Sequence, residues 1–309
     1  MRPPRTPRQT SVPRVLRPHT VLGPPARPLR FFHGDCVETL RHVGAGTVDV
    51  VVTSPPYNLG IRYRSYDDRR PRPEYLDWVA TWVREVARIL TPTGSFFLNV
   101  GSKPTDPWAP LDVAQAVRPF LRLQNTLHWI KSIAIDRHAV GDDSDPGRDL
   151  AVGHYKPINS PRFVNDCHEF VFHFTPEGRT PLDRLALGVP YQDSSNVTRW
   201  RDAHRGIRCR GNTWFLPYET IQSRDRDRPH PATFPARLPE FCLRLHGCDR
   251  IGRVVDPFLG LGSTAVACAT LGLPFDGIEM DQGYLDVAIE RAREALAAAS
   301  GLRQGRLPV

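Results

Sequence analysis

The sequence predicts an α/β fold with an open, mostly parallel sheet, on three observations. The apolar run Val48–Thr53 has the length and composition of a buried parallel strand. A second run, Val254–Asp256, passes through a glycine turn into a helical segment. A third, Phe275–Glu279, ends in an acid and again precedes a helical segment. Strand–helix units of this kind form one sheet, with its chemistry at the carboxyl ends of the strands.

The remaining elements follow from spacing and punctuation. Glu74–Leu90 carries apolar residues at helical spacing, Thr91–Gly94 breaks that helix, and Ser95–Val100 is the next buried strand. Ser263 is a good N-cap for the helix that follows it. Further strands are expected at Leu127–Ile130 and Glu169–Phe174, and further helices at Phe234–His246, Ser263–Leu271 and Gly283–Ala299.

The tetrapeptide Ser54-Pro55-Pro56-Tyr57 stands at the carboxyl end of the first strand. Its prolines lack N–H donors and leave carbonyls free to accept hydrogen bonds. The Ser54 hydroxyl beside the Pro55 carbonyl can hold one amino group, and Tyr57 offers a flat face for a planar ring. We interpret this tetrapeptide as a site for a nucleobase amine. Asn99 either supports that pocket or bonds only to the local backbone.

The glycine turn after Asp256 suits a ligand, because glycines let the backbone approach it closely. Glu279 follows this turn by ~20 residues, the separation of a ribose-binding carboxylate in dinucleotide sites. A nicotinamide dehydrogenase would share both features. It would not explain the Ser-Pro-Pro-Tyr tetrapeptide, and the third glycine of its fingerprint is missing.

Together these motifs resemble those of amino-methylating DNA methyltransferases that use S-adenosylmethionine. Ser54–Tyr57 matches the family's catalytic (D/N/S)-P-P-(Y/F/W) motif, and Asp256–Gly262 matches its cofactor motif. Three further segments resemble family segments: Phe31–Asp35, whose acid meets adenine, Cys167–Phe174, a late strand of the catalytic half, and His230–Pro235, which lies along the methionine part. The catalytic motif precedes a variable region and then the cofactor motif, which is the permuted order called the β class.

The resemblance implies a Rossmann-like methyltransferase sheet of seven strands, one of them antiparallel, with a target-recognition insert. It assigns catalysis to Ser54, Pro55, Pro56 and Tyr57. It assigns cofactor binding to Asp35, Phe234, Pro235, Asp256, Phe258, Gly260, Gly262, Ser263, Thr264 and Glu279. In this family a serine at the first catalytic position usually accompanies methylation of cytosine N4, whereas Asp or Asn accompanies adenine N6. We therefore expect an N4-cytosine enzyme acting on a flipped base, with N6-adenine as the alternative.

The composition suits a globular chain of 309 residues with 40% hydrophobic content. No apolar run approaches the ~18 residues of a membrane span, and no secretory segment is evident, so we expect a cytoplasmic protein. The six cysteines form no Cys-x-x-Cys pair, which favours free thiols over a zinc site. His168 and His173 face opposite sides of a strand, so no metal is expected.

The net charge of +8 suits a polyanionic partner, and we expect double-stranded DNA. The same charge can equally reflect GC-rich coding, because the 41 basic residues include only three lysines. Five arginines of the variable region are the expected DNA contacts, with a solvated loop as the alternative reading: Arg199, Arg201, Arg205, Arg208 and Arg210.

Four regions are expected along the chain. Residues 1–28 form a basic, Pro/Arg-rich disordered arm, residues 29–174 the catalytic half, residues 175–229 the variable target-recognition region, and residues 230–309 the cofactor-binding half. A cognate restriction endonuclease and a homodimer are further expected partners. A non-catalytic nucleic-acid-binding module is the rival class outside enzymes, and RNA or a protein amide is the alternative acceptor.

Overall fold

A nine-stranded sheet forms the centre of the molecule in the computed structural model, which describes residues 16–61, 65–139, 148–153, 159–191, 206–217 and 233–304. The strands lie in the order β1-β2-β13-β12-β3-β4-β8-β5-β11. Their bounds are β1 Thr20–Leu22, β2 Leu29–His33, β3 Val48–Thr53, β4 Leu90–Val100, β5 Arg122–Ile130, β8 His168–Thr175, β11 Thr213–Phe215, β12 Val254–Asp256 and β13 Phe275–Glu279. Seven of them, from β2 to β5, form the expected methyltransferase sheet, in which β8 is antiparallel to both of its neighbours. β1 pairs antiparallel at one edge and β11 pairs parallel at the other.

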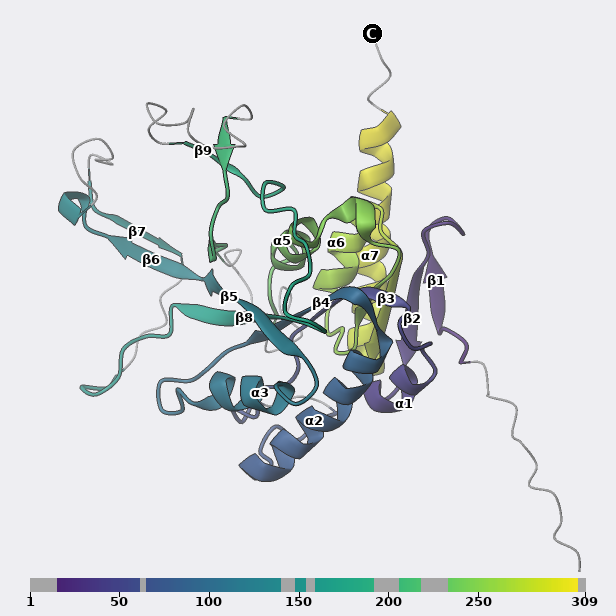
Figure 1. Cartoon of the computed structure of the whole chain (residues 1–309), viewed down its shortest axis with the longest axis horizontal. Coiled ribbons are helices and arrows are strands. Elements are labelled where there is room, and N and C mark those ends of the chain that lie inside the picture. Colours follow the sequence, from purple (N-terminus) through teal and green to yellow (C-terminus); the bar gives the residue numbers. More distant parts are fainter. Residues whose placement is uncertain are drawn as a thin grey trace, which may run out of the picture.

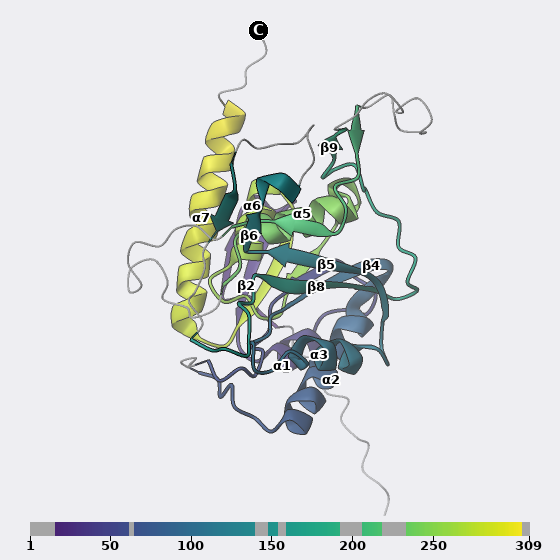
Figure 2. The ribbon, with the colours of Figure 1, turned by 90° about the vertical axis from the view of Figure 1, so that its left-hand side faces the viewer.

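Helices cover both faces of this sheet (Figure 1 and Figure 2). α1, α2 and α3 pack on one face, and α5, α6 and α7 pack on the other. Their bounds are α1 Cys36–Arg41, α2 Arg72–Ile89, α3 Ala109–Val117, α5 Arg237–His246, α6 Ser263–Leu271 and α7 Gln282–Gln304. The predicted α/β architecture is therefore confirmed.

The strands have this double cover because successive side chains point to opposite faces. In β3, Val50 and Val52 join the core under α5, α6 and α7, while Val51 joins the core under α1, α2 and α3. In β4, Phe97 joins the core under α5, α6 and α7, and Phe96 joins the core under α1, α2 and α3. Both faces are buried, so the strand sequences show continuous apolar runs.

The Thr91–Gly94 segment differs in detail from its expected role as a simple break. α2 ends at Ile89, and β4 begins at once with Leu90 opposite Val48. The next paired residue is Ser95 opposite Val50, so the intervening residues bulge out of the ladder. The turn residues thus interrupt the pairing of one long strand.

The variable region contributes to the sheet as well as to its surroundings. Trp214 in β11 is 1% exposed and packs edge-on against Phe241 of α5. The variable stretch 175–229 is therefore partly integrated into the main core. It also holds the small pair β9 Val189–Pro190 with β10 Ile207–Arg208. A second hairpin, β6 Ser132–Ile135 with β7 Leu150–Gly153, extends away from the body after β5 (Figure 1).

The expected disordered arm is shorter than residues 1–28. Thr20–Leu22 pairs with Leu29–Phe31, so at least this part of the arm is an edge strand. Leu22 also packs against the core, an apolar contact that the composition of the arm does not predict. The part of the arm before residue 16 lies outside the described residues.

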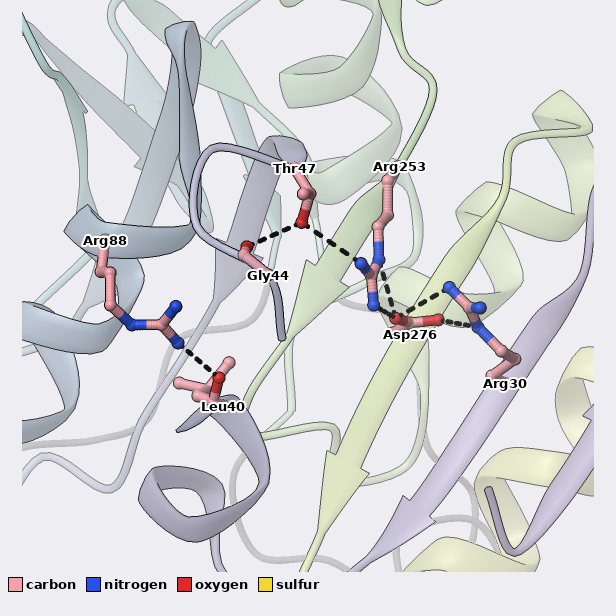
Figure 3. Close-up of polar contacts among 7 residues, drawn as sticks. All are labelled: Arg30, Leu40, Gly44, Thr47, Arg88, Arg253 and Asp276. Carbon is pink, nitrogen blue, oxygen red and sulfur yellow. Dashed lines mark hydrogen bonds and ion pairs between the residues drawn. The ribbon is translucent and has the colours of Figure 1, made fainter. Parts of the chain in front are cut away.

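The amino ends of the strands are tied by one carboxylate (Figure 3). Asp276 of β13 accepts from the Arg30 guanidinium of β2, with Nε 2.5 Å from Oδ1, and from the guanidinium of Arg253 next to β12. Nearby, Arg88 of α2 donates to the carbonyl of Leu40 at 2.8 Å, which covers the end of α1. These contacts stabilise the edge of the sheet that lies opposite the predicted site.

Candidate active site

A pocket lies at the carboxyl ends of β2, β3, β12 and β13. Its walls come from the turn before α1, the Ser-Pro-Pro-Tyr segment, the glycine turn after β12 and the end of β13. The predicted residues that line it are Asp35, Ser54, Pro56, Phe234, Phe258, Gly260, Ser263 and Glu279. Pro55, Tyr57, Pro235, Asp256, Gly262 and Thr264 lie beside it and do not line it. The fold thus brings half of the catalytic tetrapeptide and most of the cofactor motif to one cavity.

Glu279 presents a carboxylate at the end of β13. Its Oε2 accepts from the Gly260 N–H at 2.8 Å, and its Oε1 accepts from the Asp281 N–H at 2.9 Å. Burial, and then the neighbouring Asp281 charge, raise the pKa of this carboxyl above its ordinary value. The two backbone bonds fix the carboxylate in a pocket wall, where a vicinal diol could bind it.

Asp35 precedes α1 and caps it. Its Oδ1 accepts from the N–H groups of Val37 at 2.8 Å and Glu38 at 3.0 Å. The same residue lines the pocket, so the cap holds the carboxylate at the cavity. Its contact with adenine stays a prediction.

Asp256 lies beside the pocket and binds residues of both motifs, and its cofactor contact stays a prediction. Its buried carboxylate accepts from the hydroxyls of Thr53 at 2.6 Å and Thr264 at 2.7 Å, and from the Phe258 N–H at 3.1 Å. Desolvation raises the pKa of this carboxyl to about 6, against the opposing effect of its three donors. Asp256 therefore ties the residue before Ser54 to the cofactor turn, and it positions both motifs.

Gly262 and Ser263 also act on the fold. Gly262 has φ 78° and is the N-cap residue of α6, where a Cβ would lie 2.8 Å from the Cβ of Ala288 in α7. Ser263 is the first residue of α6, so its expected N-cap role is wrong. Its hydroxyl instead donates to the Phe234 carbonyl at 2.7 Å. That bond anchors the segment that precedes α5 beside the pocket.

An aromatic wall of the pocket was not predicted from the sequence. Tyr66 and Trp78 pack with ring centroids 5.4 Å apart, and Trp78 meets Phe258 at 5.5 Å. The Arg70 guanidinium lies over the Tyr66 ring at 5.0 Å. These rings suit a planar ligand. The one sequence signal was the aromatic content of the segment after Tyr57, which has no regular spacing.

The loop that carries Tyr66 of this wall is held by the Asp68 and Ser65 side chains. The buried Asp68 carboxylate accepts from the N–H groups of Asn58 at 2.7 Å, Leu59 at 3.1 Å and Ile61 at 3.0 Å. Ser65 then donates to Asp281 at 2.6 Å, across the pocket from the loop to the start of α7. The loop is thereby fastened at its base and at the pocket rim.

The catalytic tetrapeptide leads into a polar network. The Ser54 and Tyr57 hydroxyls lie 2.5 Å apart, and the Tyr57 ring is 7% exposed. Asn99 Nδ2 donates to Tyr57 Oη at 2.6 Å, which resolves the two expected roles of Asn99 in favour of the pocket. Pro56 offers its carbonyl to the Tyr75 hydroxyl at 2.8 Å. The stacking role of Tyr57 stays a prediction.

Two of the five predicted DNA-contact arginines lie in the described part of the chain. Arg208 is exposed on β10, and its guanidinium donates to the neighbouring Cys209 carbonyl. Arg210 donates through Nε to the Leu187 carbonyl at 3.1 Å, and its guanidinium lies over the Phe241 ring. The other three, Arg199, Arg201 and Arg205, lie outside the described residues.

No group of three or more His, Cys, Asp or Glu side chains is placed to hold a metal ion in the described part of the chain. None of the helices described here combines the length and apolar character needed to cross a membrane.

Comparison with known proteins identifies the family. Residues 48–290 match the DNA methylase family, and this match spans most of the chain, so the chain belongs to that family. M.BglII, a Type II methyltransferase of Bacillus subtilis, is 27% identical over 84% of this chain and 68% of its own length. The DNA adenine methyltransferase YhdJ of Escherichia coli strain K12 is 24% identical over 89% of this chain and 88% of its own.

The fold is shared with a solved methyltransferase. The structure of PvuII DNA methyltransferase, described as cytosine-N4-specific, superposes with a TM-score of 0.60 and 17% identity over 90% of this chain and 93% of that chain. The predicted DNA methyltransferase class and its S-adenosylmethionine cofactor are thus confirmed at the level of the family. One sequence relative is described as an adenine methyltransferase and the structure with the shared fold as cytosine-N4-specific, so these matches do not select the acceptor atom.

Proposed function

We propose that this protein methylates the N4 amine of a cytosine in duplex DNA, with S-adenosylmethionine as the methyl donor. The observation that carries the proposal is the position of Ser54. It lines the same pocket as Glu279 and Phe258, so the predicted amine acceptor adjoins the predicted cofactor site. A serine at this position supports cytosine N4 over adenine N6.

The pocket fits the proposed donor. Glu279 offers a fixed carboxylate to a ribose diol, and the Tyr66, Trp78 and Phe258 rings offer faces or edges to a purine. When bound, S-adenosylmethionine supplies an electrophilic methyl group on a sulfonium sulfur. This chain supplies the residues that hold the donor and aim the amine.

The acceptor amine needs help because its lone pair is delocalised into the base, and because a stacked base cannot reach the pocket. Base flipping costs a few kcal/mol, and stacking on an aromatic ring such as Tyr57 offsets part of that cost. The Ser54 hydroxyl and the Pro55 carbonyl accept from the amine and favour its tetrahedral form. Positioning then provides most of the rate, with no covalent adduct to the enzyme.

Duplex DNA is the proposed partner, and the arginines of the variable region are its proposed contacts. Arg208 supports this proposal because it is exposed on β10, with its guanidinium bound to the neighbouring Cys209 carbonyl. We also propose that a restriction endonuclease of the same specificity accompanies the enzyme, a suggestion supported by relatives that are Type II methyltransferases. The cytoplasmic location and the homodimer stay predictions.

The test is nucleoside mass spectrometry of DNA from cells that express the protein. We expect N4-methylcytosine with wild type and none with Ser54→Ala, provided that the variant still binds S-adenosylmethionine. N6-methyladenine without N4-methylcytosine would overturn the choice of base and leave the enzyme class standing. DNA with neither modification would overturn the proposed function.

A further inference from the structure

A chain of polar groups runs from Ser54 away from the pocket and ends at an ion pair. Tyr57 Oη lies 3.2 Å from Glu169 Oε2, and Asn99 Nδ2 lies 2.8 Å from the same oxygen. The other carboxylate oxygen, Oε1, accepts from Lys131 Nζ at 3.2 Å. Neither Glu169 nor Lys131 lines the pocket, and neither is among the predicted catalytic or cofactor-binding residues.

The sheet topology brings these residues together. Asn99 stands near the carboxyl end of β4, and Lys131 directly follows β5. Glu169 stands at the amino end of β8, opposite Trp129. Because β8 is antiparallel to both neighbours, its first residues lie at the edge where β4 and β5 end. One sheet edge therefore holds Ser54 and the whole chain of polar groups.

The hydrogen-bond donors and acceptors in this series of polar groups permit one favourable orientation of the hydroxyl protons. A carboxylate only accepts hydrogen bonds, so Glu169 accepts from the Tyr57 hydroxyl, from the Asn99 amide nitrogen and from the Lys131 ammonium. The reverse orientation of the Asn99 amide would set its oxygen against the carboxylate. Tyr57 has a single hydroxyl proton, and once this is donated to Glu169 the Tyr57 oxygen must accept from Ser54.

This orientation decides what Ser54 can do for an amine. Ser54 Oγ accepts from Asn99 Nδ2 at 3.4 Å, which uses one of its two lone pairs. A Ser54 hydroxyl that donates to Tyr57 keeps the other lone pair for the pocket side, where an incoming N–H needs an acceptor. A Ser54 hydroxyl that pointed its proton into the pocket would compete for the nitrogen lone pair that must attack the methyl group. The carboxylate at the end of the chain therefore bears on catalysis from outside the pocket.

We propose that Glu169, held by Lys131, is a positioning residue that makes Ser54 an acceptor and that later takes up the product proton. As the N–CH3 bond forms and the S–CH3 bond breaks, the amine becomes a cation. One N–H proton then moves to Ser54 Oγ, the Ser54 proton moves to Tyr57 Oη, and the Tyr57 proton moves to the Glu169 carboxylate. The proposal rests on the methyltransferase function proposed above.

Three further points support a functional role over a structural one. The side chains of Glu169 and Lys131 are 12% and 17% exposed. Because desolvation of the two charges opposes their attraction, this ion pair contributes little net stability. Gly101 leaves room for the contact, because a Cβ there would lie 3.1 Å from both Glu169 Cδ and Tyr57 Cε2. The family motif also admits Phe or Trp in place of Tyr57, so stacking alone does not require the hydroxyl used here.

The test measures single-turnover methylation of duplex DNA by wild type, Glu169→Gln, Glu169→Ala, Tyr57→Phe and the double variant of Glu169→Gln with Tyr57→Phe, together with S-adenosylmethionine affinity. Glu169→Gln keeps the shape and removes the charge, so we expect its rate to fall by about tenfold, and Glu169→Ala by about a hundredfold. We expect cofactor affinity to stay unchanged in all of them. The double variant should be no slower than the worse single variant, because both changes interrupt one chain.

The matched control is Glu85→Gln. Glu85 forms a comparable ion pair with Arg88 on α2, and its side chain is 17% exposed. We expect this variant to methylate at the wild-type rate. A Glu169→Gln rate equal to wild type, or losses that multiply in the double variant, would overturn the proposal while the methyltransferase function stands. A wild type that methylates no DNA would overturn the proposed function, and this proposal with it.

Discussion

Glu279→Gln tests how the pocket recognises its cofactor. In wild type each carboxylate oxygen already accepts one backbone N–H, from Gly260 and from Asp281. A ribose diol adds hydrogen bonds to a charged acceptor, each worth roughly 1.5–3 kcal/mol. Glutamine has one acceptor oxygen, and its amide nitrogen must face one of the two backbone donors. We expect the variant to lose about 2–3 kcal/mol of binding free energy, a roughly 30- to 150-fold weaker Kd.

The pH dependence of the same binding provides a second readout. Burial raises the pKa of Glu279, with the Asp281 charge acting in the same direction. The charged form is the stronger acceptor, so affinity should fall as the pH falls through this raised pKa. The wild-type loss should therefore begin at a higher pH than an ordinary glutamate would give. The Glu279→Gln variant has no such ionisation and should lack this decline.

Isothermal titration calorimetry with S-adenosylmethionine measures both effects. The control is Glu240→Gln, which alters a surface ion pair with Arg244 on α5 and should bind like wild type. If Glu279→Gln binds within twofold of wild type and follows the same pH curve, the ribose role of Glu279 is wrong. Folding of each variant is checked by circular dichroism before titration.

Three other predictions concern stability, measured by urea unfolding. Gly262→Ala should lower the free energy of unfolding by roughly 2–4 kcal/mol, because of the positive φ at this position and the contact of the new Cβ with α7. Adding Ala288→Gly should restore only the part that comes from the steric contact. Equal stability of the single variant and wild type would contradict this prediction. Asp276→Asn should lower the free energy of unfolding by about 2–3 kcal/mol, because the guanidiniums of Arg30 and Arg253 lose a carboxylate that is 3% exposed. An unchanged free energy of unfolding would show that these ion pairs do not stabilise the sheet. His173 and His246 are buried, with pKa values lowered by desolvation to about 3 and about 4, so each stays neutral in the fold while the unfolded chain takes up protons below its ordinary value of 6.5. The stability that these neutral histidines contribute is complete above pH 6.5 and is lost as the pH falls toward 4. His246→Phe should reduce the loss of unfolding free energy at acid pH by up to ~3 kcal/mol. An unchanged dependence of stability on acid pH would refute the role given to His246.

The strands and helices that the sequence predicted well are those with a strong apolar pattern. β3 and β13 match their predicted bounds because both are buried on two faces. The bounds of α2 differ from the predicted Glu74–Leu90 by two residues at the start and one at the end. The agreement is this close because the apolar residues at helical spacing mark the buried face of the helix. β1 and β11 are short, and their pairing partners, not their own composition, make them strands.

The site was predictable where a strand end carries a motif and unpredictable where distant side chains meet. Ser54 and Glu279 were found because each directly ends a recognisable strand. Trp78 was missed because it lies in the middle of α2, where no local signal marks it as a pocket residue that packs against Tyr66 and Phe258. Glu169 was noticed only as part of a strand, because its partners lie 38 and 112 residues away along the chain.

The two motifs are joined by a contact that explains how the permuted order is tolerated. Thr53 and Asp256 are 203 residues apart in sequence, yet β3 and β12 are adjacent parallel strands. Their carboxyl ends therefore meet whichever motif comes first along the chain. The carboxylate of Asp256 then binds Thr53 on one side and Thr264 on the other, so the acceptor loop and the cofactor turn share one buried anchor. Methyl transfer depends on the distance between these loops, and that distance is set by strand adjacency and by Asp256 rather than by the order of the segments.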